Sequence, residues 1–526
     1  MLSSSSEVMD EESTVPFLED NTSSLLPEEV NVKKRNFEYL ESFPSPLILL
    51  LTSTASISGF MFGYDTGYVS AALVSIGKDL GGSLLTIRDK EVITSATSLG
   101  ALLGALSGGL LADIWGRKRV ILLSNLLFIV GGGAQVFSQV VNSMIWGRFI
   151  MGIGVGVGSL VAPLFISELA PPQFRGRLVV INCLAITGGQ LVAYLVGALL
   201  RNWRILIAIG CIPALIQTLF FIYLPDTPRF YLMKGYHDKA FQVLRRINPG
   251  ISDTAIEDKI LQINQQNKQS TLGLSPWRSI WVNYIRIHRK ASNLRALIIA
   301  CSLQAIQQLT GLNALMYFAS TIFQMVGFKN SNLVSMVIAG TNFIFTVIAL
   351  FVIDRVGRRR ILLWTLPVMA MSLFLCSVCF HYISVDFDRD GQPIIAPGTA
   401  NIWGYFLILA FISVVASYAL GIGNIPWQQS ELFSQDVRGT GISISTATNW
   451  TSCLIVSSSF LTAMKLVTPS GTFLIFSIIG VLSVVLIAFI YPELSGLELE
   501  ETQEILQDGF NVKKSVQLSL QRHRTQ

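Results

Sequence analysis

Charged residues are scarce in this chain. Asp, Glu, Lys and Arg make up 13% of its 526 residues, whereas soluble domains carry about 25%. Hydrophobic residues make up 51%, and the mean hydropathy is +0.55. This composition excludes an ordinary soluble protein and predicts a membrane protein. The net charge of +5 does not indicate nucleic-acid binding, because the basic residues lie in short segments between apolar runs, where they set membrane orientation.

Histidine and cysteine are also few. The four histidines are scattered and show no metal-ligand spacing. All six cysteines lie in apolar runs, and Cys376 and Cys379 form a C-x-x-C with no second pair and no strand beside it. We interpret these cysteines as small residues within helices. No nucleophile and base occur in a catalytic pattern, so we expect no metal site, no cofactor and no enzyme activity.

Long apolar runs, in contrast, are abundant. Twelve runs of about 20 residues are each long enough to cross a bilayer. Two of them, 178–199 and 440–464, carry more polar residues than the others. The expected limits are 47–72, 92–112, 119–140, 145–167, 178–199, 203–223, 294–320, 331–353, 360–382, 401–425, 440–464 and 470–491.

The basic residues predict the orientation of these spans. They gather at 117–119, 175–177, 358–360 and in the polar stretch 224–293, which lie on one side if the helices alternate. Cytoplasmic loops are the ones enriched in Lys and Arg. Both termini and the central stretch are therefore predicted to be cytoplasmic. The polar start of the chain lacks the apolar core of a cleavable signal peptide.

The second half of the chain repeats landmarks of the first half. "DIWGRKR" (113–119) matches "DRVGRRR" (354–360), and "ELAPPQFRG" (168–176) matches "ELFSQDVRG" (431–439). "PDTP" after the sixth span is echoed by "PELS" after the twelfth. Landmarks in the same order indicate a duplicated six-helix unit, and transporters built from such repeats bind substrate between the halves at the midplane.

These observations predict an all-α membrane protein with two pseudo-symmetric six-helix bundles, 47–223 and 294–491. The stretch 224–293 is expected to form a cytoplasmic helical linker between them. Residues 1–46 are expected to be a disordered cytoplasmic tail, and residues 492–526 a second cytoplasmic tail.

Several motifs together resemble the sugar porter family of the major facilitator superfamily, over about 47–510. Two depart from the usual wording of that family: Pro is common where Asn424 stands, and the last motif usually reads Pro-Glu-Thr-Lys-Gly. In these places the chain resembles the fungal proton/myo-inositol symporters. The motifs are "LADIWGRKR", "WGRFIMGIGVGVG", "ISELAPPQFRG", "LPDTPRF", "QQLTGLNALMYF", "DRVGRRR", "GNIPWQQSELF" and "PELSGLELEE".

The resemblance implies the major facilitator fold and secondary active uptake of myo-inositol across the plasma membrane by alternating access. It also implies protons as the coupling ion, no cofactor, and function as a monomer. Three alternatives remain at this point: a proton/hexose symporter of the same fold, a polyol facilitator, and a nutrient sensor that transports little.

Two opposite charges lie inside apolar runs. Asp65 lies near the end of the first span, in "GFMFGYDTG", and Arg148 lies near the start of the fourth span, in "WGRFIMG". A charge at the centre of a membrane helix costs about 2.5–3.5 kcal/mol on insertion scales. Either Asp65 is solvated at the membrane edge while Arg148 reaches the interface, or the two form a pair. The resemblance favours a pair that takes up and releases a proton.

The seventh span contains four amides in "QAIQQLTGLNALMYF". Gln304, Gln307 and Gln308 share one broad helix face, and Asn313 lies further round. Amides both donate and accept hydrogen bonds, which suits an uncharged polyhydroxyl substrate; hydrogen bonding between helices is the plainer interpretation. The resemblance implies substrate contacts from Gln190, Gln307, Gln308, Asn313, Tyr317, Asn342, Gly423, Trp427 and Asn449.

Some of these positions carry further expectations. Trp427 would stack its ring on the apolar C–H face of the substrate, and Asn449 stands where many relatives have Gln. Pro426, close to Gly421 and Gly423 in the tenth span, predicts a kinked or broken helix. The glycines of "GIGVGVG" (152–158) lack the strand of a dinucleotide-binding loop and are expected to permit close helix contacts.

The repeated loops contain paired acidic and basic residues. These residues are either simple topology anchors, or a salt-bridge network that holds the cytoplasmic side closed in one state. Such pairs must be breakable, which favours a partly wet location. The resemblance supports the network and assigns it to Asp113, Arg117, Glu168, Arg175, Asp354, Arg358, Glu431 and Arg438.

Overall fold

The structure is a computed structural model that describes residues 45–171, 175–200, 202–271, 276–383, 385, 401–434, 437–495, 497 and 499–525. The expected disordered tail, 1–46, lies almost entirely outside these residues. Among the described residues every regular element is a helix, and no strand occurs.

The first six long helices follow the first six apolar runs closely. α3 begins with a capping box, in which Thr86 Oγ1 accepts the Asp89 N–H at 3.1 Å and Asp89 Oδ2 accepts the Thr86 N–H at 3.0 Å. The helices are α2 (Pro46–Ser75), α3 (Ile87–Trp115), α4 (Arg117–Val136), α5 (Val141–Leu169), α6 (Arg175–Leu199) and α7 (Trp203–Tyr223).

The polar stretch after α7 forms short helices, as its composition predicts. α9 (His237–Ile247) buries Ala240, Val243, Leu244 and Ile247, the spacing of one helix face. Its neighbours are α8 (Pro228–Met233), α10 (Asp253–Thr271) and α11 (Pro276–Arg289).

The second half repeats the order of long helices seen in the first half. Two further helices, α19 and α20, follow its last long helix. Its elements are α12 (Ala291–Leu309), α13 (Leu312–Met325), α14 (Ser331–Val356), α15 (Arg358–Tyr382), α16 (Ile402–Leu420), the 3₁₀ helix η2 (Ile425–Glu431), α17 (Arg438–Leu466), α18 (Pro469–Ile490), α19 (Leu499–Ile505) and α20 (Val512–Thr525).

Two spans are broken helices. The break in the tenth span is confirmed: α16 ends at Leu420, and η2 follows after four residues. The seventh span, expected as one continuous run over 294–320, is instead divided into α12 and α13. Gly311 adopts φ +84° at this break, and a Cβ there would lie 2.7 Å from the ring of Phe476, so the position requires glycine.

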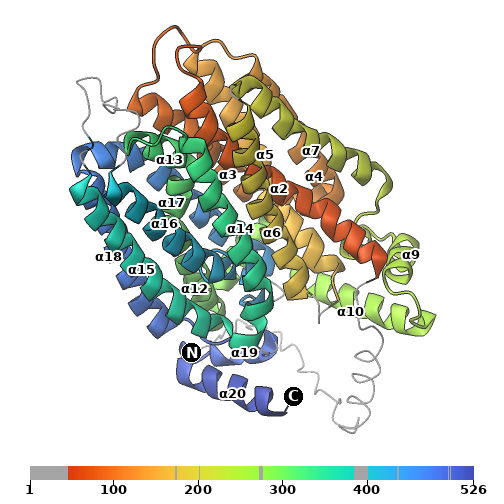
Figure 1. Cartoon of the computed structure of the whole chain (residues 1–526). Helices are drawn as coiled ribbons and strands as arrows, with labels where there is room; N and C mark the ends of the chain where they lie inside the picture. The colour runs from red at the N-terminus through yellow and green to blue at the C-terminus, as the bar shows by residue number, and fades with distance from the viewer. Residues whose placement is uncertain are drawn as a thin grey trace, which may run out of the picture. The chain divides into compact units, whose positions relative to one another are not determined.

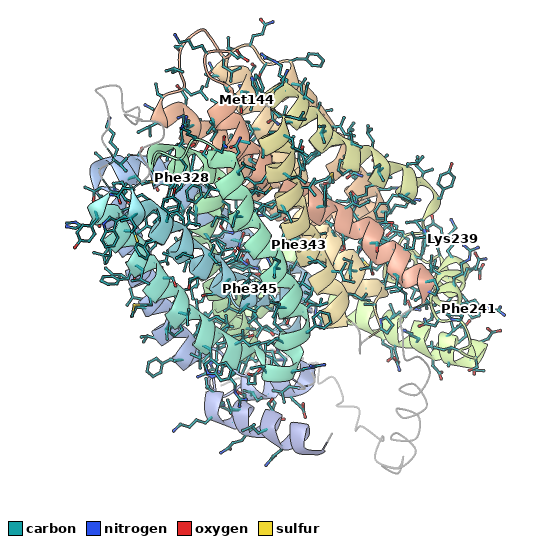
Figure 2. The ribbon with its side chains drawn as sticks, viewed as in Figure 1. Met144, Lys239, Phe241, Phe328, Phe343 and Phe345 are labelled. Carbon is teal, nitrogen blue, oxygen red and sulfur yellow. The ribbon has the colours of Figure 1, made fainter. Side chains whose placement is uncertain are left out.

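Ten helices in the described part of the chain are long and apolar enough to cross a membrane. The two other expected spans are the broken pair α12–α13 and α17, whose amide and hydroxyl side chains lower their hydropathy. Large apolar side chains cover the outer helix surfaces, and Phe489, Phe351 and Leu219 are 72%, 60% and 58% exposed. Figure 2 shows the side chains that project from these outer surfaces. This surface fits a lipid environment.

Each half packs mainly on itself. In the first half α3 and α4 both pack on α5, and α2 packs on α6; in the second half α15 packs on α16 and α18 (Figure 1). The halves meet where α3 contacts α17, α6 contacts α14 and α2 contacts α13. The glycines of α5 allow close contact with α3, since a Cβ at Gly156 would lie 2.1 Å from the Ala101 carbonyl oxygen.

Candidate functional site

A pocket lies between the two groups of helices. It contains about 570 Å³ of space, part of it open to solvent. Its walls come from α2 and α6 of the first half and from α12, α13, α14, α16 and η2 of the second. No charged side chain is among the described residues that line it.

The structure brings most of the predicted substrate residues together at this pocket. The lining residues among them are Gln190, Gln307, Gln308, Asn313, Asn342, Gly423 and Trp427. Sequence reasoning did not assign Thr66, Thr187 or Asn424, which also line the pocket. Thr187 could have been predicted from its spacing, because it lies three residues before Gln190 and therefore on the same helix face.

Asn449 lies behind the pocket and orients its amides. Its Nδ2 donates to Gln304 Oε1 at 2.7 Å and to Gln307 Oε1 at 2.8 Å, and its Oδ1 accepts from Gln308 Nε2 at 3.0 Å. Asn313 Nδ2 donates to Gln308 Oε1 at 2.9 Å. The seventh-span amides therefore hold helices together and line the pocket at the same time.

The two broken helices support each other. Gln307 Nε2 donates to the carbonyl oxygens of Ile422 and Gly423 at 3.0 and 2.9 Å, and Gln304 Nε2 donates to that of Pro426 at 3.1 Å. Carbonyls freed by a helix break need partners in a membrane, and the glutamines of α12 supply them. The pocket wall thus combines side chains of one broken helix with backbone of the other.

The two halves also meet directly at the pocket. Asn342 Nδ2 of α14 donates to Gln190 Oε1 of α6 at 2.9 Å. Both side chains line the pocket and are at most 6% exposed. This bond joins a pocket-lining side chain of one half to a pocket-lining side chain of the other half.

Tyr317 is not among the residues that line the pocket, although it lies close to Thr66, which does. Its side chain is fully buried, and its hydroxyl has no hydrogen-bond partner among the described residues. The hydroxyl interacts electrostatically with Asp65 and Arg148. Tyr317 therefore lies next to the charged pair of the first half.

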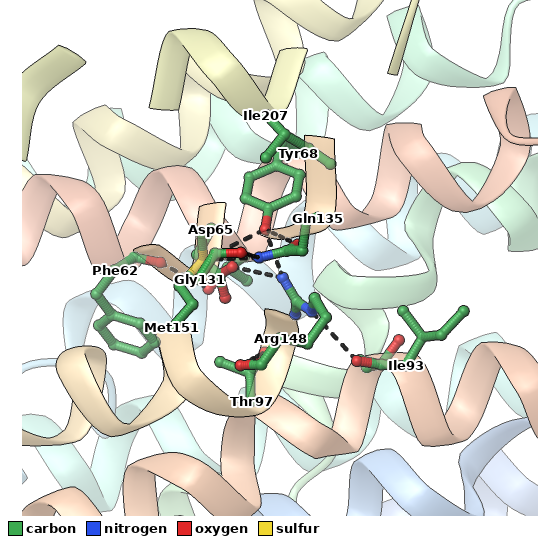
Figure 3. Close-up of polar contacts among 12 residues, drawn as sticks. Phe62, Asp65, Tyr68, Ile93, Thr97, Gly131, Gln135, Arg148, Met151 and Ile207 are labelled. Carbon is green, nitrogen blue, oxygen red and sulfur yellow. Dashed lines mark hydrogen bonds and ion pairs between the residues drawn. The ribbon is translucent and has the colours of Figure 1, made fainter. Parts of the chain in front are cut away.

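Asp65 of α2 and Arg148 of α5 form an ion pair (Figure 3). Arg148 Nη1 lies 2.5 Å from Asp65 Oδ1, and both side chains are 0% exposed. In this structure Asp65 is therefore not solvated at the membrane edge, and Arg148 does not reach the interface. Among the described residues, Asp65 Oδ2 and Arg148 Nη2 have no further hydrogen-bond partner.

Two neutral side chains complete this cluster, and sequence reasoning did not assign them. Arg148 Nη1 donates to the Tyr68 hydroxyl at 2.8 Å, which donates to Gln135 Oε1 at 2.8 Å. Arg148 Nε donates to the Ile93 carbonyl oxygen at 3.2 Å. Tyr68 could have been predicted to lie beside Asp65, because it follows Asp65 by three residues and shares its helix face.

The charged pair adjoins the pocket through its own helix. Phe62 and Thr66 line the pocket one turn apart, and Thr66 Oγ1 donates to the Phe62 carbonyl oxygen at 3.1 Å. Thr66 directly follows Asp65, and Phe62 lies one turn before Thr66. A shift of this helix segment would move both the pocket wall and the carboxylate.

One end of the helix bundle, which we call the basic end, carries the repeated loops with Arg117 and Arg358. Arg117 Nη2 lies 2.9 Å from Glu168 Oε1 and 3.0 Å from Asp113 Oδ1, and the Thr227 hydroxyl donates to Glu168 Oε2 at 2.6 Å. The Arg117 guanidinium is 3% exposed, whereas Asp113 is 54% exposed.

The second half contains a matching network. Arg358 Nη2 lies 3.1 Å from Glu431 Oε1, and its Nε donates to Gln428 Oε1 at 2.9 Å. Arg438 begins α17. The side chains of the two remaining predicted members, Arg175 and Asp354, lie outside the described residues.

The repeated segments "PDTP" and "PELS" have the same structural role in the two halves: their acidic residues cap a helix. Asp226 Oδ2 accepts the Lys118 N–H at 3.2 Å, and Glu493 accepts the N–H groups of Arg358 and Arg359 at 3.0 and 3.2 Å. Each carboxylate thus caps the first turn of the helix after the repeated glycine, where the helix dipole favours negative charge. Burial raises the pKa of Asp226.

A smaller pocket of about 390 Å³ lies toward the basic end, between α5, α17 and η2. Trp427 lines both pockets. At the opposite end the halves are in contact, since Ser70 Oγ donates to Ser320 Oγ at 3.2 Å and Glu91 accepts the N–H and the hydroxyl of Thr462 at 2.7 Å each.

The sequence matches the family described as "Sugar (and other) transporter" over residues 51–506. It is 52% identical over 482 residues to Myo-inositol transporter 1 of Saccharomyces cerevisiae, which covers 91% of this chain and 82% of that protein. It is 49% identical to Myo-inositol transporter 1 of Candida albicans (92% and 87% covered). It is 42% identical to Myo-inositol transporter 2 of Schizosaccharomyces pombe (94% and 88% covered).

Solved structures show the same fold. The proton:xylose symporter XylE bound to 6-bromo-6-deoxy-D-glucose matches with a TM-score of 0.72 at 24% identity, covering 88% of this chain and 100% of that chain. The inward open conformation of the xylose transporter XylE from E. coli matches with a TM-score of 0.68 at 24% identity, covering 87% and 99%. The predicted major facilitator fold is confirmed.

Proposed function

The chain belongs to the sugar transporter family, and on this premise we propose that it takes up myo-inositol across the plasma membrane together with a proton. The family membership and the names of its relatives support the substrate. The chemistry of the pocket supports it independently.

The observation that carries the proposal is the neutral, amide-rich wall of the pocket. Gln190, Gln307, Gln308, Asn313 and Asn342 all line it, and no described lining residue is charged. A polyol offers many hydroxyl donors and acceptors and no charge, so side chains that both donate and accept suit it. Trp427 supplies an apolar surface for the C–H face of the ring.

The buried pair of Asp65 and Arg148 supports proton coupling. An ionisable residue inside a membrane is costly and is a functional-site candidate, and this carboxylate lies next to Thr66 of the pocket wall. When Arg148 is close, the carboxylate is favoured in its charged form; when Arg148 moves away, it is favoured in its neutral form. A substrate-linked movement of α2 against α5 would therefore bind a proton on one side and release it on the other.

The arrangement of contacts supports alternating access with both termini in the cytoplasm. The halves touch at the end opposite the basic end, while the second pocket beside Trp427 extends toward the basic end. The positive-inside rule assigns the basic end to the cytoplasm. In this structure the networks of Arg117 and Arg358 each join residues of one half. Rearranged so that they pair across the halves, they would hold that side closed in the outward-facing state, and the protein would act as a monomer.

An uptake panel tests the substrate. The full-length chain is expressed in cells without their own inositol uptake, and labelled myo-inositol and labelled glucose are compared at equal concentration. We expect saturable inositol uptake that a tenfold excess of glucose does not inhibit. Glucose uptake equal to that of inositol would support the hexose symporter, and absence of both would support a sensor.

A further inference from the structure

Serines, rather than apolar side chains, form the most buried positions of α20. Ser515 and Ser519 lie one helical turn apart and are 0% and 5% exposed, whereas Leu520 on the same helix is 45% exposed. Figure 1 shows α20 beside α19 at the end of the helix bundle. A helix normally buries its apolar stripe, so α20 is attached in an unusual way.

Both serines bind the backbone of the "PELS" segment. Ser515 Oγ accepts the Glu493 N–H at 3.0 Å and donates to the Val512 carbonyl oxygen at 2.8 Å. Ser519 Oγ donates to the Ser495 carbonyl oxygen at 2.9 Å. Each neutral hydrogen bond contributes only about 0.5–1.5 kcal/mol net, so a charge placed at one of these serines can outweigh the contacts that the serines make.

A surface ion pair on α20 and a hydrogen bond just before it accompany these two serine contacts. Lys514 Nζ lies 3.4 Å from Glu504 Oε1 with both side chains more than half exposed, and such surface ion pairs contribute little. Asn511 Nδ2, just before the helix, donates to the Ile505 carbonyl oxygen at 3.0 Å. α19 is held separately, because Gln503 Nε2 donates to the Leu432 carbonyl oxygen at 2.6 Å.

The segment that α20 contacts belongs to the Arg358 network. Glu493, whose N–H binds Ser515, uses its carboxylate to cap α15 at Arg358 and Arg359. The Arg358 side chain binds Gln428 and Glu431 of η2. η2 also contains Trp427, which lines the pocket. Three successive contacts therefore connect Ser515 to η2, and η2 itself carries Trp427 of the pocket wall.

We propose that Ser515 is a phosphorylation site that a kinase reaches when α20 is transiently detached, and that the phosphate keeps α20 from rebinding and loosens the Glu493–Arg358 end of the transporter. A protein kinase would transfer the γ-phosphoryl group of ATP to Ser515 Oγ. The new O–P bond replaces the bond between the β and γ phosphates, ADP leaves, and the hydroxyl proton passes to the base of the kinase. This inference rests on the proposed cytoplasmic location of α20, where ATP is present.

The site favours release for two physical reasons. A phosphate carries a charge of about −1.5 to −2 at pH 7, and it is disruptive where it is buried beside a carboxylate. Ser515 has no solvent exposure and lies against Glu493, itself 6% exposed, so the phosphorylated helix cannot return to this position. The exposed residues Lys513 and Lys514 directly precede Ser515 and give a kinase a basic recognition feature.

Hydrogen–deuterium exchange on the purified full-length chain in nanodiscs tests the release, and it requires no transport. We expect Ser515→Asp to increase amide exchange across 512–525 at least tenfold, with α19 unchanged. Gln517→Glu, which adds one negative charge on the exposed face of the same helix, should leave the exchange of α20 within twofold of wild type.

Mass spectrometry of the chain purified from cells with phosphatase inhibitors tests the modification. We expect a phosphate on Ser515 that is lost in Ser515→Ala. Unphosphorylated Ser515, or equal exchange of α20 in Ser515→Asp and wild type, would overturn the proposal. Failure of inositol uptake would instead affect the proposed function alone, because neither measurement depends on the substrate.

Discussion

Asp65→Asn removes one charge from the buried pair and should abolish uphill uptake while sparing exchange. An asparagine Oδ1 can still accept a hydrogen bond from Arg148 Nη1, which lies 2.5 Å from the carboxylate in the native protein. The variant therefore keeps much of the local geometry but cannot bind and release a proton. The carrier can still reorient with inositol bound, so counterflow should continue.

The size of the effect follows from the driving force of one proton. A membrane potential of about 100 mV contributes roughly 2.3 kcal/mol, and one pH unit adds about 1.4 kcal/mol. Together these support accumulation on the order of 500-fold, since each 1.4 kcal/mol or so is a factor of ten. Asp65→Asn should reduce the inside-to-outside ratio from this limit to one.

The assay uses proteoliposomes with an imposed pH gradient and potential, in which labelled inositol is followed to steady state. Loss of one partner of a buried ion pair costs about 3–5 kcal/mol of folding stability, so a thermal melt must show that the variant is folded. Asp79→Asn is the control, because Asp79 is an exposed carboxylate paired with Arg204, and it should retain accumulation. Accumulation well above equilibrium in folded Asp65→Asn would refute the coupling role.

Three further substitutions test the pocket and the network at the basic end. Gln308→Ala removes hydrogen bonds to Asn313 and Asn449 and should raise the KM for inositol roughly tenfold, since each bond contributes about 0.5–1.5 kcal/mol; an unchanged KM in uptake kinetics would remove Gln308 from the site. Tyr317→Phe removes a fully buried hydroxyl of a residue that is not among those lining the pocket, so the KM should stay within twofold, and a tenfold rise would support Tyr317 as a substrate contact. Arg358→Gln breaks the pair with Glu431 and should increase cytoplasmic access to the second pocket, measured as faster maleimide labelling of a cysteine placed at Ser430; equal labelling rates would argue against the network.

The sequence predicted the spans and the repeat well, because apolar runs of membrane length and paired landmarks are local signals. The break at Gly311 was missed, since a single glycine in an apolar run is compatible with a continuous helix. Its positive φ and its contact with Phe476 arise only when α12, α13 and α18 are packed. Pro426 predicted the other break because proline acts on its own helix.

The sequence predicted most of the residues that line the pocket, but it did not predict the hydrogen bonds among them. The sequence shows Asp65 and Arg148 as charged residues inside apolar runs. Because 83 residues separate them along the chain, the sequence alone does not decide whether they pair, and the family resemblance favoured the pair. Asn449 binds Gln304, Gln307 and Gln308, an arrangement that the sequence did not predict, and its contact with substrate stays a prediction. Which side chain faces a pocket and which supports it depends on helix rotation in the packed bundle.

The measurement that tests the central claim most directly is proton movement on addition of inositol. Proteoliposomes containing the full-length chain are suspended in weakly buffered medium, and the external pH is recorded as inositol is added. We predict an external alkalinisation with one proton taken up per inositol, absent in Asp65→Asn. Inositol uptake by the wild-type chain without any change in external pH would contradict the account.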